Sequence, residues 1–310
     1  MRGDFLNTQV LHKQNGKINI IFNEQHQSKS EKQNVDYLNN NKQLKVIDEQ
    51  FSSFVGLAYF KNIIKEIYAT RLINERRAQV GLSINKQVLH MLFKGNPGTG
   101  KTTIARELAK VLFQLNILSK GHFIEAERAD LVGEYIGQTA QKTRAIVQKA
   151  LGGVLFIDEA YSLARGGHKD FGREAIDTLV KQMEDHANDF VLILAGYPDE
   201  MEQFVVLNPG LKSRFPFHIH FKDYTIKELI EIAEQIASER EYELSPCAIV
   251  KLKKLLHEKT MDYLPHFANA RYIRNIIEQS IRLHAIRLLH DQDFTIRDLS
   301  VIKEIDITAI

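Results

Sequence analysis

The feature that most constrains this chain is a glycine-rich motif, GNPGTGKT, at residues 95–102. It follows an apolar run at residues 88–93 and precedes apolar residues spaced as in a helix, at residues 102–115. The motif has the form G-x-x-x-x-G-K-[ST], whose glycines let the backbone wrap a phosphate group with its N–H groups pointing inward. The sequence therefore predicts a phosphate-binding loop between a buried strand and a helix, with a plain glycine turn as the alternative.

The motif supplies most of the candidate nucleotide ligands, so ATP and magnesium are the expected cofactors. We expect Lys101 to reach the β and γ phosphates during catalysis and the Thr102 hydroxyl to bind Mg²⁺. The helix that follows adds the positive end of its dipole. The other residues expected to contact the nucleotide here are Gly95, Asn96, Pro97, Gly98, Thr99, Gly100 and Thr103.

A second candidate element is an apolar run that ends in two acids, VLFIDE at residues 154–159. In a parallel sheet the carboxyl ends of the strands form the edge at which ligands bind. We expect Asp158 to orient the Mg²⁺ shell and Glu159 to polarise the attacking water as general base. A strand followed by an acid is a common pattern, so this interpretation depends on the phosphate loop.

The order of apolar runs and helical patterns predicts the fold class. Strands of near-continuous apolar residues that alternate with helices are typical of an α/β fold whose parallel sheet is covered on both faces. A helix that stops near Gly81 precedes the first strand. The strand-like runs lie at residues 88–93, 122–124, 153–157, 190–194 and, as an edge strand, 217–221, and the helical patterns at residues 102–115, 139–150 and 174–183.

Beyond residue 222 the strand-like runs stop. Thr225 and Glu228 form a capping box, Ser245 followed by Pro246 marks a second helix start, and residues 269–289 give a third helical pattern. We therefore expect three parts. They are an Asn/Gln-rich extension at residues 1–50, an α/β nucleotide-binding domain at residues 51–222 and a small all-helical domain at residues 223–310.

Composition limits the remaining possibilities. Asn and Gln fill 15 of the first 50 positions, so we expect that extension to be partly disordered or a small hairpin around residues 17–22. The whole chain has 310 residues and a formal net charge of +2, which argues against a nucleic-acid partner. The single cysteine, Cys247, and the lack of a signal segment or a long apolar run fit a cytoplasmic protein without a membrane span.

Together these motifs resemble the AAA+ ATPases and, more closely, the CbbX/CfxQ family. The resemblance implies an AAA+ P-loop NTPase core, a C-terminal helical lid, Mg-dependent ATP hydrolysis and a homo-oligomeric ring, expected to be a hexamer. It extends over residues 51–290 and is carried by residues 89–98, 130–137, 156–163, 194–197 and 208–215.

The resemblance also implies further site residues. Arg214 matches the arginine finger that reaches the γ-phosphate held by a neighbouring subunit. Arg271 matches the lid arginine that senses the nucleotide, with Arg274 as the reserve candidate. Val55 and Gly56 match the segment that holds adenine in relatives. The alternative for Arg214 is an exposed arginine at the sheet rim, and the alternative for Arg271 is a solvated helix face. For Val55 and Gly56 it is a packing site at a helix start.

Tyr135, Ile136 and Gly137 match the family's aromatic pore loop. An aromatic beside a flexible glycine suits gripping an extended chain without sequence demands. The alternative is a buried aromatic in a strand-to-helix loop. One position departs from the family pattern, because many AAA+ proteins have a polar residue, often Asn, where this chain has Tyr197. The Tyr197 hydroxyl is the candidate substitute for that sensing role.

Two functional hypotheses follow. The first is a mechanochemical ATPase that remodels or threads an unknown protein client. Its expected setting is sporulation, because the resemblance is strongest to a family member implicated in spore maturation; a Rubisco-activase-like remodeller is the alternative. The second hypothesis is an ATP-gated binding scaffold or a switch associated with nucleic acid, which needs no pore aromatic.

Overall fold

The computed structural model describes residues 42–52, 54–84, 87–135, 137–165, 170–261, 267–290 and 294–309. The hairpin expected around residues 17–22, the rest of the extension before residue 42, and Ile136 lie outside these ranges. The chain divides into two compact units, Met1–Lys45 and Val46–Ile310. The sheet, the helices that cover it and the C-terminal helices all belong to the second unit.

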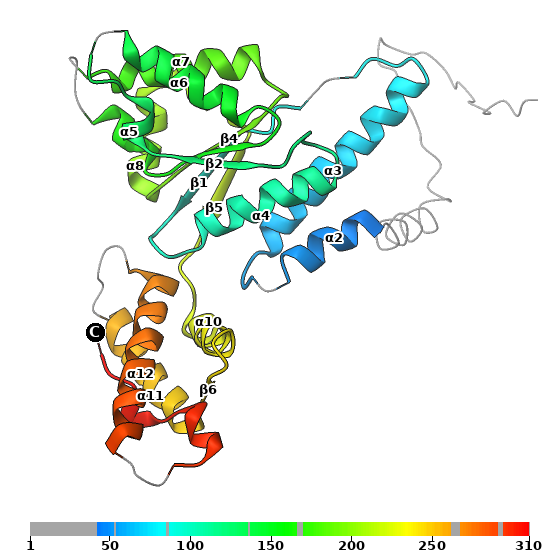
Figure 1. The fold of residues 1–310 in the computed structure, drawn as a ribbon. Helices are drawn as coiled ribbons and strands as arrows, with labels where there is room; N and C mark the ends of the chain where they lie inside the picture. Colours follow the sequence, from blue (N-terminus) through cyan, green and yellow to red (C-terminus); the bar gives the residue numbers. More distant parts are fainter. Residues whose placement is uncertain are drawn as a thin grey trace, which may run out of the picture. The chain divides into compact units, whose positions relative to one another are not determined.

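Five parallel strands form one sheet in the order β2-β3-β4-β1-β5 (Figure 1). Phe93 of β1 pairs with Ala195 of β4 on one side and with Ile219 of β5 on the other. The predicted α/β fold with a parallel sheet is confirmed, and the last strand lies at the edge as predicted. The strands are β1 (Met91–Gly95), β2 (Phe123–Ala126), β3 (Val154–Ile157), β4 (Val191–Gly196) and β5 (Phe217–Phe221).

Helices cover both faces of the sheet (Figure 1). On one face, Leu92, Leu155 and Leu192 pack among residues of α6 (Gln138–Ala150), α7 (Gly172–Asp185) and α8 (Pro198–Leu207). On the other face, Phe93 packs edge-on against Phe60 of α3 (Ala58–Gln79), and α4 (Lys101–Gln114) contacts β3. Every residue of β3 and β4 is buried, which explains why both strands are continuous apolar runs.

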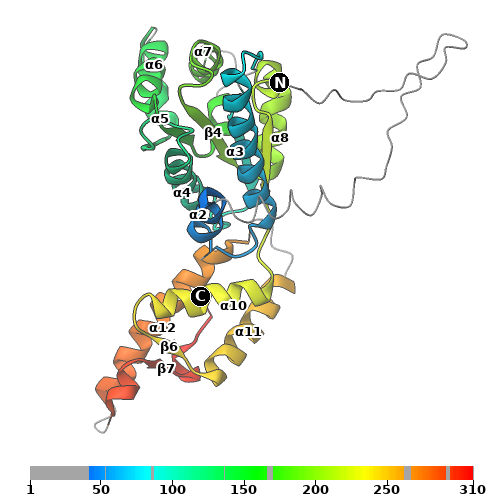
Figure 2. The same cartoon turned by 90° about the vertical axis from the view of Figure 1, so that its right-hand side faces the viewer.

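The C-terminal helices enclose a core of their own. The capping box starts α10 (Ile226–Ser238), because the Thr225 N–H donates to Glu228 Oε2 at 2.8 Å and the Glu228 N–H to Thr225 Oγ1 at 3.3 Å. The helices α10, α11 (Pro246–Met261) and α12 (Asn269–His290) lie together in Figure 2. They share the buried side chains of Leu229, Leu252 and Ile276, so the expected helical lid is confirmed as a fold.

The lid is not entirely helical, which corrects the expectation that strands stop at residue 222. β6 (Glu243–Leu244) and β7 (Val301–Ile302) form a short parallel pair. Ile302 is fully buried in the core of the lid, so the pair fastens the chain end to the helices. Strands of two residues are too short to show the alternating pattern by which a strand is predicted. The other short elements are α5 (Arg128–Leu131), η2 (Ala160–Ala164), α9 (Pro209–Lys212), η4 (Ile296–Leu299) and η5 (Glu304–Asp306).

Residues 42–50 also differ from expectation, since they form helix α2 (Lys42–Gln50) within the segment expected to be disordered or a hairpin. Ile47 is fully buried, and Phe51 packs its ring edge-on against Phe60 with the centroids 5.4 Å apart. Burial of these apolar side chains stabilises the helix, although most residues of the segment are polar. Composition averaged over the first fifty residues therefore hides a helix at their end.

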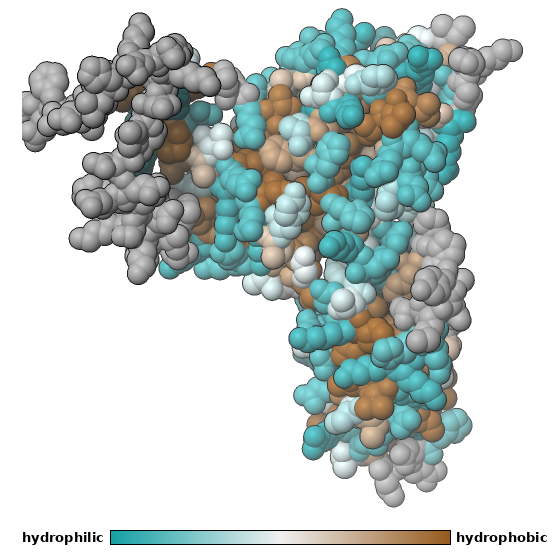
Figure 3. All heavy atoms as spheres, turned by 180° about the vertical axis from the view of Figure 1, so that it is seen from behind, coloured by the Kyte–Doolittle hydropathy of each residue, from teal (hydrophilic) through white to brown (hydrophobic). Residues whose placement is uncertain are grey.

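Within the described ranges, no helix is both long enough and apolar enough to cross a membrane. Hydrophilic side chains cover most of the face seen in Figure 3, with apolar side chains between them. Cys247 is exposed and free.

Candidate functional site

A cavity of about 250 Å³ lies at the carboxyl ends of β1, β3 and β4, where the phosphate loop passes into α4. Most residues that the sequence predicts for the nucleotide line it. One site thus gathers residues from the loop, from the acid pair and from the start of α12. The lining residues are Pro97, Gly98, Gly100, Lys101, Thr102, Thr103, Asp158, Glu159, Gly196, Tyr197, Ala270, Arg271 and Arg274.

The phosphate loop curls around its own lysine. The Lys101 ammonium donates to the carbonyl oxygens of Gly95, at 2.7 Å, and Asn96, at 2.9 Å. The hydroxyl of Thr99, a buried side chain, donates to the same Asn96 carbonyl at 2.8 Å. Gly100 precedes α4 with φ +89, in the left-handed region that favours glycine. The glycines of the motif therefore permit the turn that places Lys101 inside the loop.

Carboxylates and a second cation lie near the Lys101 ammonium. Burial lowers the pKa of its ammonium, the Asp158 carboxylate opposes that shift, and the Arg271 guanidinium adds to it. The carboxylates of Asp223 and Glu159 also act to raise the pKa. Cations suited to phosphate oxygens and carboxylates suited to a divalent cation are therefore close enough to interact.

The acid pair lies on a turn of unusual backbone conformation. Glu159 has φ +45, which is uncommon for a residue with a side chain, and its N–H donates to Asp158 Oδ1 at 2.9 Å. Backbone strain of this kind is found disproportionately at functional sites. The turn ends β3 and leads into η2, and both carboxylates line the cavity.

Thr102 and Asp158 fit a magnesium ion that arrives with a nucleotide. A hydroxyl and a carboxylate are hard oxygen ligands, and both residues line the cavity beside Lys101. In the part of the chain that the structure describes, no group of three or more His, Cys, Asp or Glu could hold a metal alone. Mg²⁺ commonly keeps water and substrate phosphates as its remaining ligands, so one or two protein oxygens are enough.

Sequence reasoning missed two residues that join the loop to the lid. Asn269, at the start of α12, donates to Asp223 Oδ1 at 2.8 Å, and the Asn96 amide donates to Asp223 Oδ2 at 2.9 Å. Asn269 is fully buried and has φ +43. The sequence offered one weak signal, because Asn269 stands two residues before Arg271 and Asp223 stands at the expected domain boundary.

Arg214 does not line the cavity of its own chain. It follows α9 and forms an ion pair with Glu184 of α7, and its Nη1 donates to the Gly210 carbonyl at 2.6 Å. Its side chain is 27% exposed, so the guanidinium is accessible from outside. This placement does not support a contact between Arg214 and a nucleotide bound by the same chain.

The two described pore-loop residues, Tyr135 and Gly137, do not line the cavity either. Tyr135 is 68% exposed, which rules out the alternative of a buried aromatic. Gly137 precedes α6 with φ +84. The described residues of this loop therefore present an aromatic side chain to solvent beside a glycine.

Val55 and Gly56 lie just before α3 and do not line the cavity. Gly56 has φ +76, and a Cβ added there would lie 3.1 Å from Glu228 Oε1 at the start of α10. Gly56 therefore adjoins the first turn of the lid.

Tyr197 lines the cavity and precedes the first turn of α8. Its ring stacks on Tyr161 with the centroids 5.9 Å apart. Burial raises the pKa of Tyr161 to about 12, and the nearby Glu159 carboxylate adds to the shift, so the Tyr161 phenol keeps its proton at neutral pH. Tyr197 thus faces the site from the strand end at which a sensing residue is expected.

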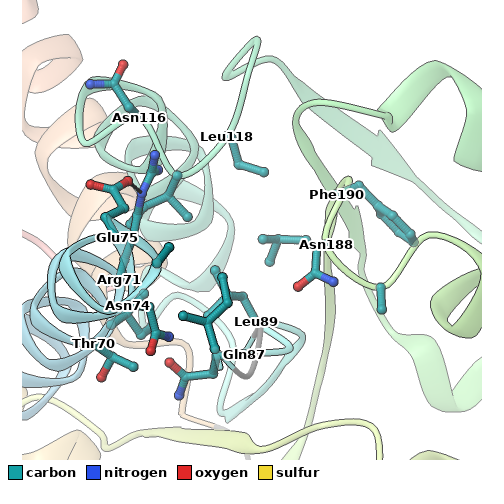
Figure 4. A pocket seen from close by; sticks show the side chains of 16 residues that line it. Thr70, Arg71, Asn74, Glu75, Gln87, Leu89, Asn116, Leu118, Asn188 and Phe190 are labelled. Carbon is teal, nitrogen blue, oxygen red and sulfur yellow. Dashed lines mark hydrogen bonds and ion pairs between the residues drawn. The ribbon is translucent and has the colours of Figure 1, made fainter. Parts of the chain in front are cut away.

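A second cavity, of about 420 Å³, lies at the amino ends of the strands (Figure 4). Arg71 and Glu75 of α3 form an ion pair at 2.8 Å on one side of it, and Asn188 and Phe190 lie across from them (Figure 4). None of the predicted site residues that the structure describes lines this cavity. The residues predicted for the nucleotide therefore line the first cavity and not this one.

A phosphate loop between a parallel strand and a helix, with an acid pair at the end of a neighbouring strand, defines a P-loop nucleoside triphosphatase. The model of the ATPase family associated with various cellular activities (AAA) matches residues 91–223, and the model of the AAA lid domain matches residues 225–310.

Sequence identity to individual proteins defines the family more closely. The chain is 55% identical to stage V sporulation protein K of Bacillus subtilis over 96% of each chain. It is 44% identical to protein CfxQ of Xanthobacter flavus, over 82% of this chain and 80% of that one. It is 43% identical to the chloroplastic ribulose bisphosphate carboxylase/oxygenase activase of Cyanidioschyzon merolae, over 78% and 83%. The chain belongs to the AAA+ ATPases, within the CbbX/CfxQ family, and it is an ATPase.

A solved structure supports the fold. The RuvB Holliday junction branch migration motor of Thermotoga maritima superposes with a TM-score of 0.50 at 21% identity. The match covers 79% of this chain and 66% of that chain, so the present chain spans about two thirds of the motor's length. At this identity the likeness shows a shared fold alone.

Proposed function

We propose that this chain is a Mg-dependent ATPase that works as a homo-oligomeric ring, a hexamer, and remodels or threads a protein client during sporulation. The observation that carries the proposal is the 55% identity to a sporulation protein over 96% of both chains. Residues 51–222 form the proposed nucleotide-binding domain and residues 223–310 the lid. The proposed compartment is the cytoplasm, where the exposed Cys247 thiol stays reduced.

In the proposed site five of the lining residues take part in three tasks. Lys101 and Arg271 bind the phosphate oxygens, and Thr102 and Asp158 hold the magnesium ion that accompanies ATP. The ion would neutralise charge that develops on the transferred phosphoryl group. The Glu159 carboxylate accepts the proton of the attacking water.

The remaining loop residues hold the polyphosphate through their backbone. The proposed contacts are the N–H groups of Gly98, Gly100 and Thr103, in a loop shaped by Gly95, Asn96, Pro97 and Thr99. Val55 and Gly56 are proposed to hold the adenine. The place of Gly56 beside the start of α10 supports this role, because the lid and the loop meet nearby.

The position of Arg214 supports the proposed ring. Its guanidinium is partly exposed and pairs with Glu184 outside the cavity of its own chain. We propose that in the ring Arg214 reaches the nucleotide of a neighbouring copy and stabilises the transition-state charge. Hydrolysis then depends on assembly.

Replacing Tyr135 by alanine is expected to spare ATP hydrolysis and abolish client remodelling. The side chain is exposed and lies away from the cavity, so its loss removes the grip on the client without touching the chemistry. Tyr59→Ala is the matched control, since Tyr59 is 67% exposed on α3 and has no proposed role. Normal remodelling by the Tyr135 variant would overturn the threading proposal.

The client is sought with Glu159→Gln, which is expected to bind ATP without hydrolysing it and so to retain what it holds. Complexes are captured from sporulating cells with ATP, and co-purifying proteins are identified by mass spectrometry. A protein enriched only while Tyr135 is intact supports a threading remodeller and names its client. Equal recovery with Tyr135→Ala, or recovery of nucleic acid instead, supports an ATP-gated scaffold.

A second candidate client is Rubisco. It is favoured by the 43% identity to a protein named as a ribulose bisphosphate carboxylase/oxygenase activase. Reactivation of substrate-inhibited Rubisco by the purified protein and ATP would support this alternative. No reactivation, together with a client captured from sporulating cells, supports the sporulation proposal.

A further inference from the structure

The phosphate loop and the first turn of α12 are joined by the side chains of Asn269 and Asp223, which have no part in the proposed hydrolysis. Asn269 donates through Nδ2 to Asp223 Oδ1 at 2.8 Å, to the Phe267 carbonyl at 2.8 Å and to the Pro97 carbonyl at 3.3 Å. Its Oδ1 accepts the Tyr224 N–H at 2.9 Å. Both polar atoms of this fully buried amide are therefore engaged.

Asp223 is the point at which the two sides meet. Its carboxylate accepts a hydrogen bond from the Asn269 amide on the lid side. On the loop side it accepts from the Asn96 amide, whose Nδ2 lies 3.0 Å from Asp223 Oδ1 and 2.9 Å from Oδ2. The Asn96 carbonyl in turn accepts the Lys101 ammonium. A continuous set of hydrogen bonds thus runs from the catalytic lysine of the loop to the start of α12.

The two backbones also touch. The Ala270 N–H donates to the Gly98 carbonyl at 3.1 Å, and the Tyr224 hydroxyl donates to the Thr99 carbonyl at 3.1 Å. A Cβ added at Gly98 would lie 2.1 Å from the Ala268 carbonyl oxygen, so this approach requires glycine. The first turn of α12 is held tightly against the loop, and Arg271 lies in that turn.

Asn269 is not an ordinary helix cap. A capping side chain accepts an N–H from the first turn of its own helix, whereas Asn269 Oδ1 accepts the N–H of Tyr224, before α10. Its φ of +43 is one that asparagine tolerates better than most side chains. The residue type therefore suits a connection between segments rather than the start of a helix.

We propose that Asn269 is a positioning residue for Arg271. Together with Asp223 and Asn96 it fixes the first turn of α12 against the phosphate loop, so that the Arg271 guanidinium is already directed at the nucleotide phosphates. A long, flexible side chain binds more tightly when its backbone is fixed, because less freedom is lost on binding. This inference rests on the phosphate-binding role proposed for Arg271.

The test is a double-mutant cycle on nucleotide affinity. Asn269→Asp keeps the shape of the side chain but removes its donors and sets a carboxylate against Asp223 and the Pro97 carbonyl. We expect this variant to bind a fluorescent ADP analogue about tenfold more weakly. Added to Arg271→Ala, the same change is expected to weaken binding by less than about twofold, because residues that act through one another are not additive.

The control is Asn116→Asp, which changes another asparagine of positive φ, +54, that is exposed at the second cavity. It is expected to leave the affinity unchanged. Thermal unfolding without nucleotide shows whether the Asn269 variant is folded. If it is not, Asn96→Ala replaces it in the cycle, since Asn96 lies at the surface of the loop and supplies the other side of the Asp223 contact.

The outcomes separate two failures. If Arg271→Ala weakens binding and the loss from Asn269→Asp or Asn96→Ala simply adds to it, the positioning inference is wrong while the role of Arg271 stands. If Arg271→Ala alone leaves the affinity unchanged, the proposed role of Arg271 is wrong, and the inference about Asn269 is overturned with it.

Discussion

Replacing Glu159 with glutamine is expected to slow ATP hydrolysis by about 10²–10⁴-fold while ATP binding is retained. The turn at φ +45 places this carboxylate in the cavity that Lys101 and Asp158 also line. Glutamine keeps the size of the side chain but cannot accept the proton of the attacking water. Phosphate release in steady state measures the first effect, and equilibrium titration with a nucleotide measures the second.

Glu202→Gln is the control for that experiment. Glu202 is 68% exposed and pairs with Lys94 at 3.4 Å, away from the cavity, so its replacement is expected to leave both hydrolysis and binding unchanged. Hydrolysis by the Glu159 variant at a rate near that of the unchanged protein would show that another group acts as the base.

Replacing Arg214 with alanine is expected to lower kcat by about 10³–10⁵-fold, as for arginine fingers elsewhere, with little change in nucleotide affinity. The side chain does not line the cavity of its own chain. It therefore contributes little to binding by that chain, and its effect falls on the transition state formed beside a neighbour. Single-turnover hydrolysis at saturating ATP isolates this step.

Glu184→Gln separates that role from a merely structural one. Arg214 pairs with Glu184, and loss of this pair is common to both variants. If Arg214 acts as a finger, the Glu184 variant keeps a kcat within about fivefold of the unchanged protein, since exposed ion pairs contribute at most about 1 kcal/mol. Equal losses in both variants would assign the effect to the ion pair instead.

Much of the fold could be predicted from the sequence because its signals are local. The loop at residues 95–102 is a contiguous pattern, and β3 and β4 are buried on both faces, so each reads as an unbroken apolar run. The start of α10 was visible in the pair Thr225 and Glu228, three residues apart. In each of these elements the residues that form the signal are adjacent or only a few positions apart in the chain.

The features that could not be predicted from the sequence depend on contacts between residues far apart in the chain. Asn269 meets Asp223 across 46 residues and Pro97 across 172, and no local pattern marks such a contact. The strand pair β6 and β7 is two residues long, and helix α2 is masked by an Asn/Gln-rich average. The family resemblance supplied Arg214, Arg271 and Tyr135, whose roles no pattern within this chain indicates by itself.

The most direct test of a ring with shared sites is to mix two inactive variants. Arg214→Ala keeps an intact Glu159, and Glu159→Gln keeps an intact finger, so an interface between the two restores one complete site. An equal mixture is expected to regain about a quarter of the normal ATPase rate, the share of interfaces that pair an intact base with an intact finger. A mixture no more active than the average of the two variants would contradict the proposal that hydrolysis is completed between subunits.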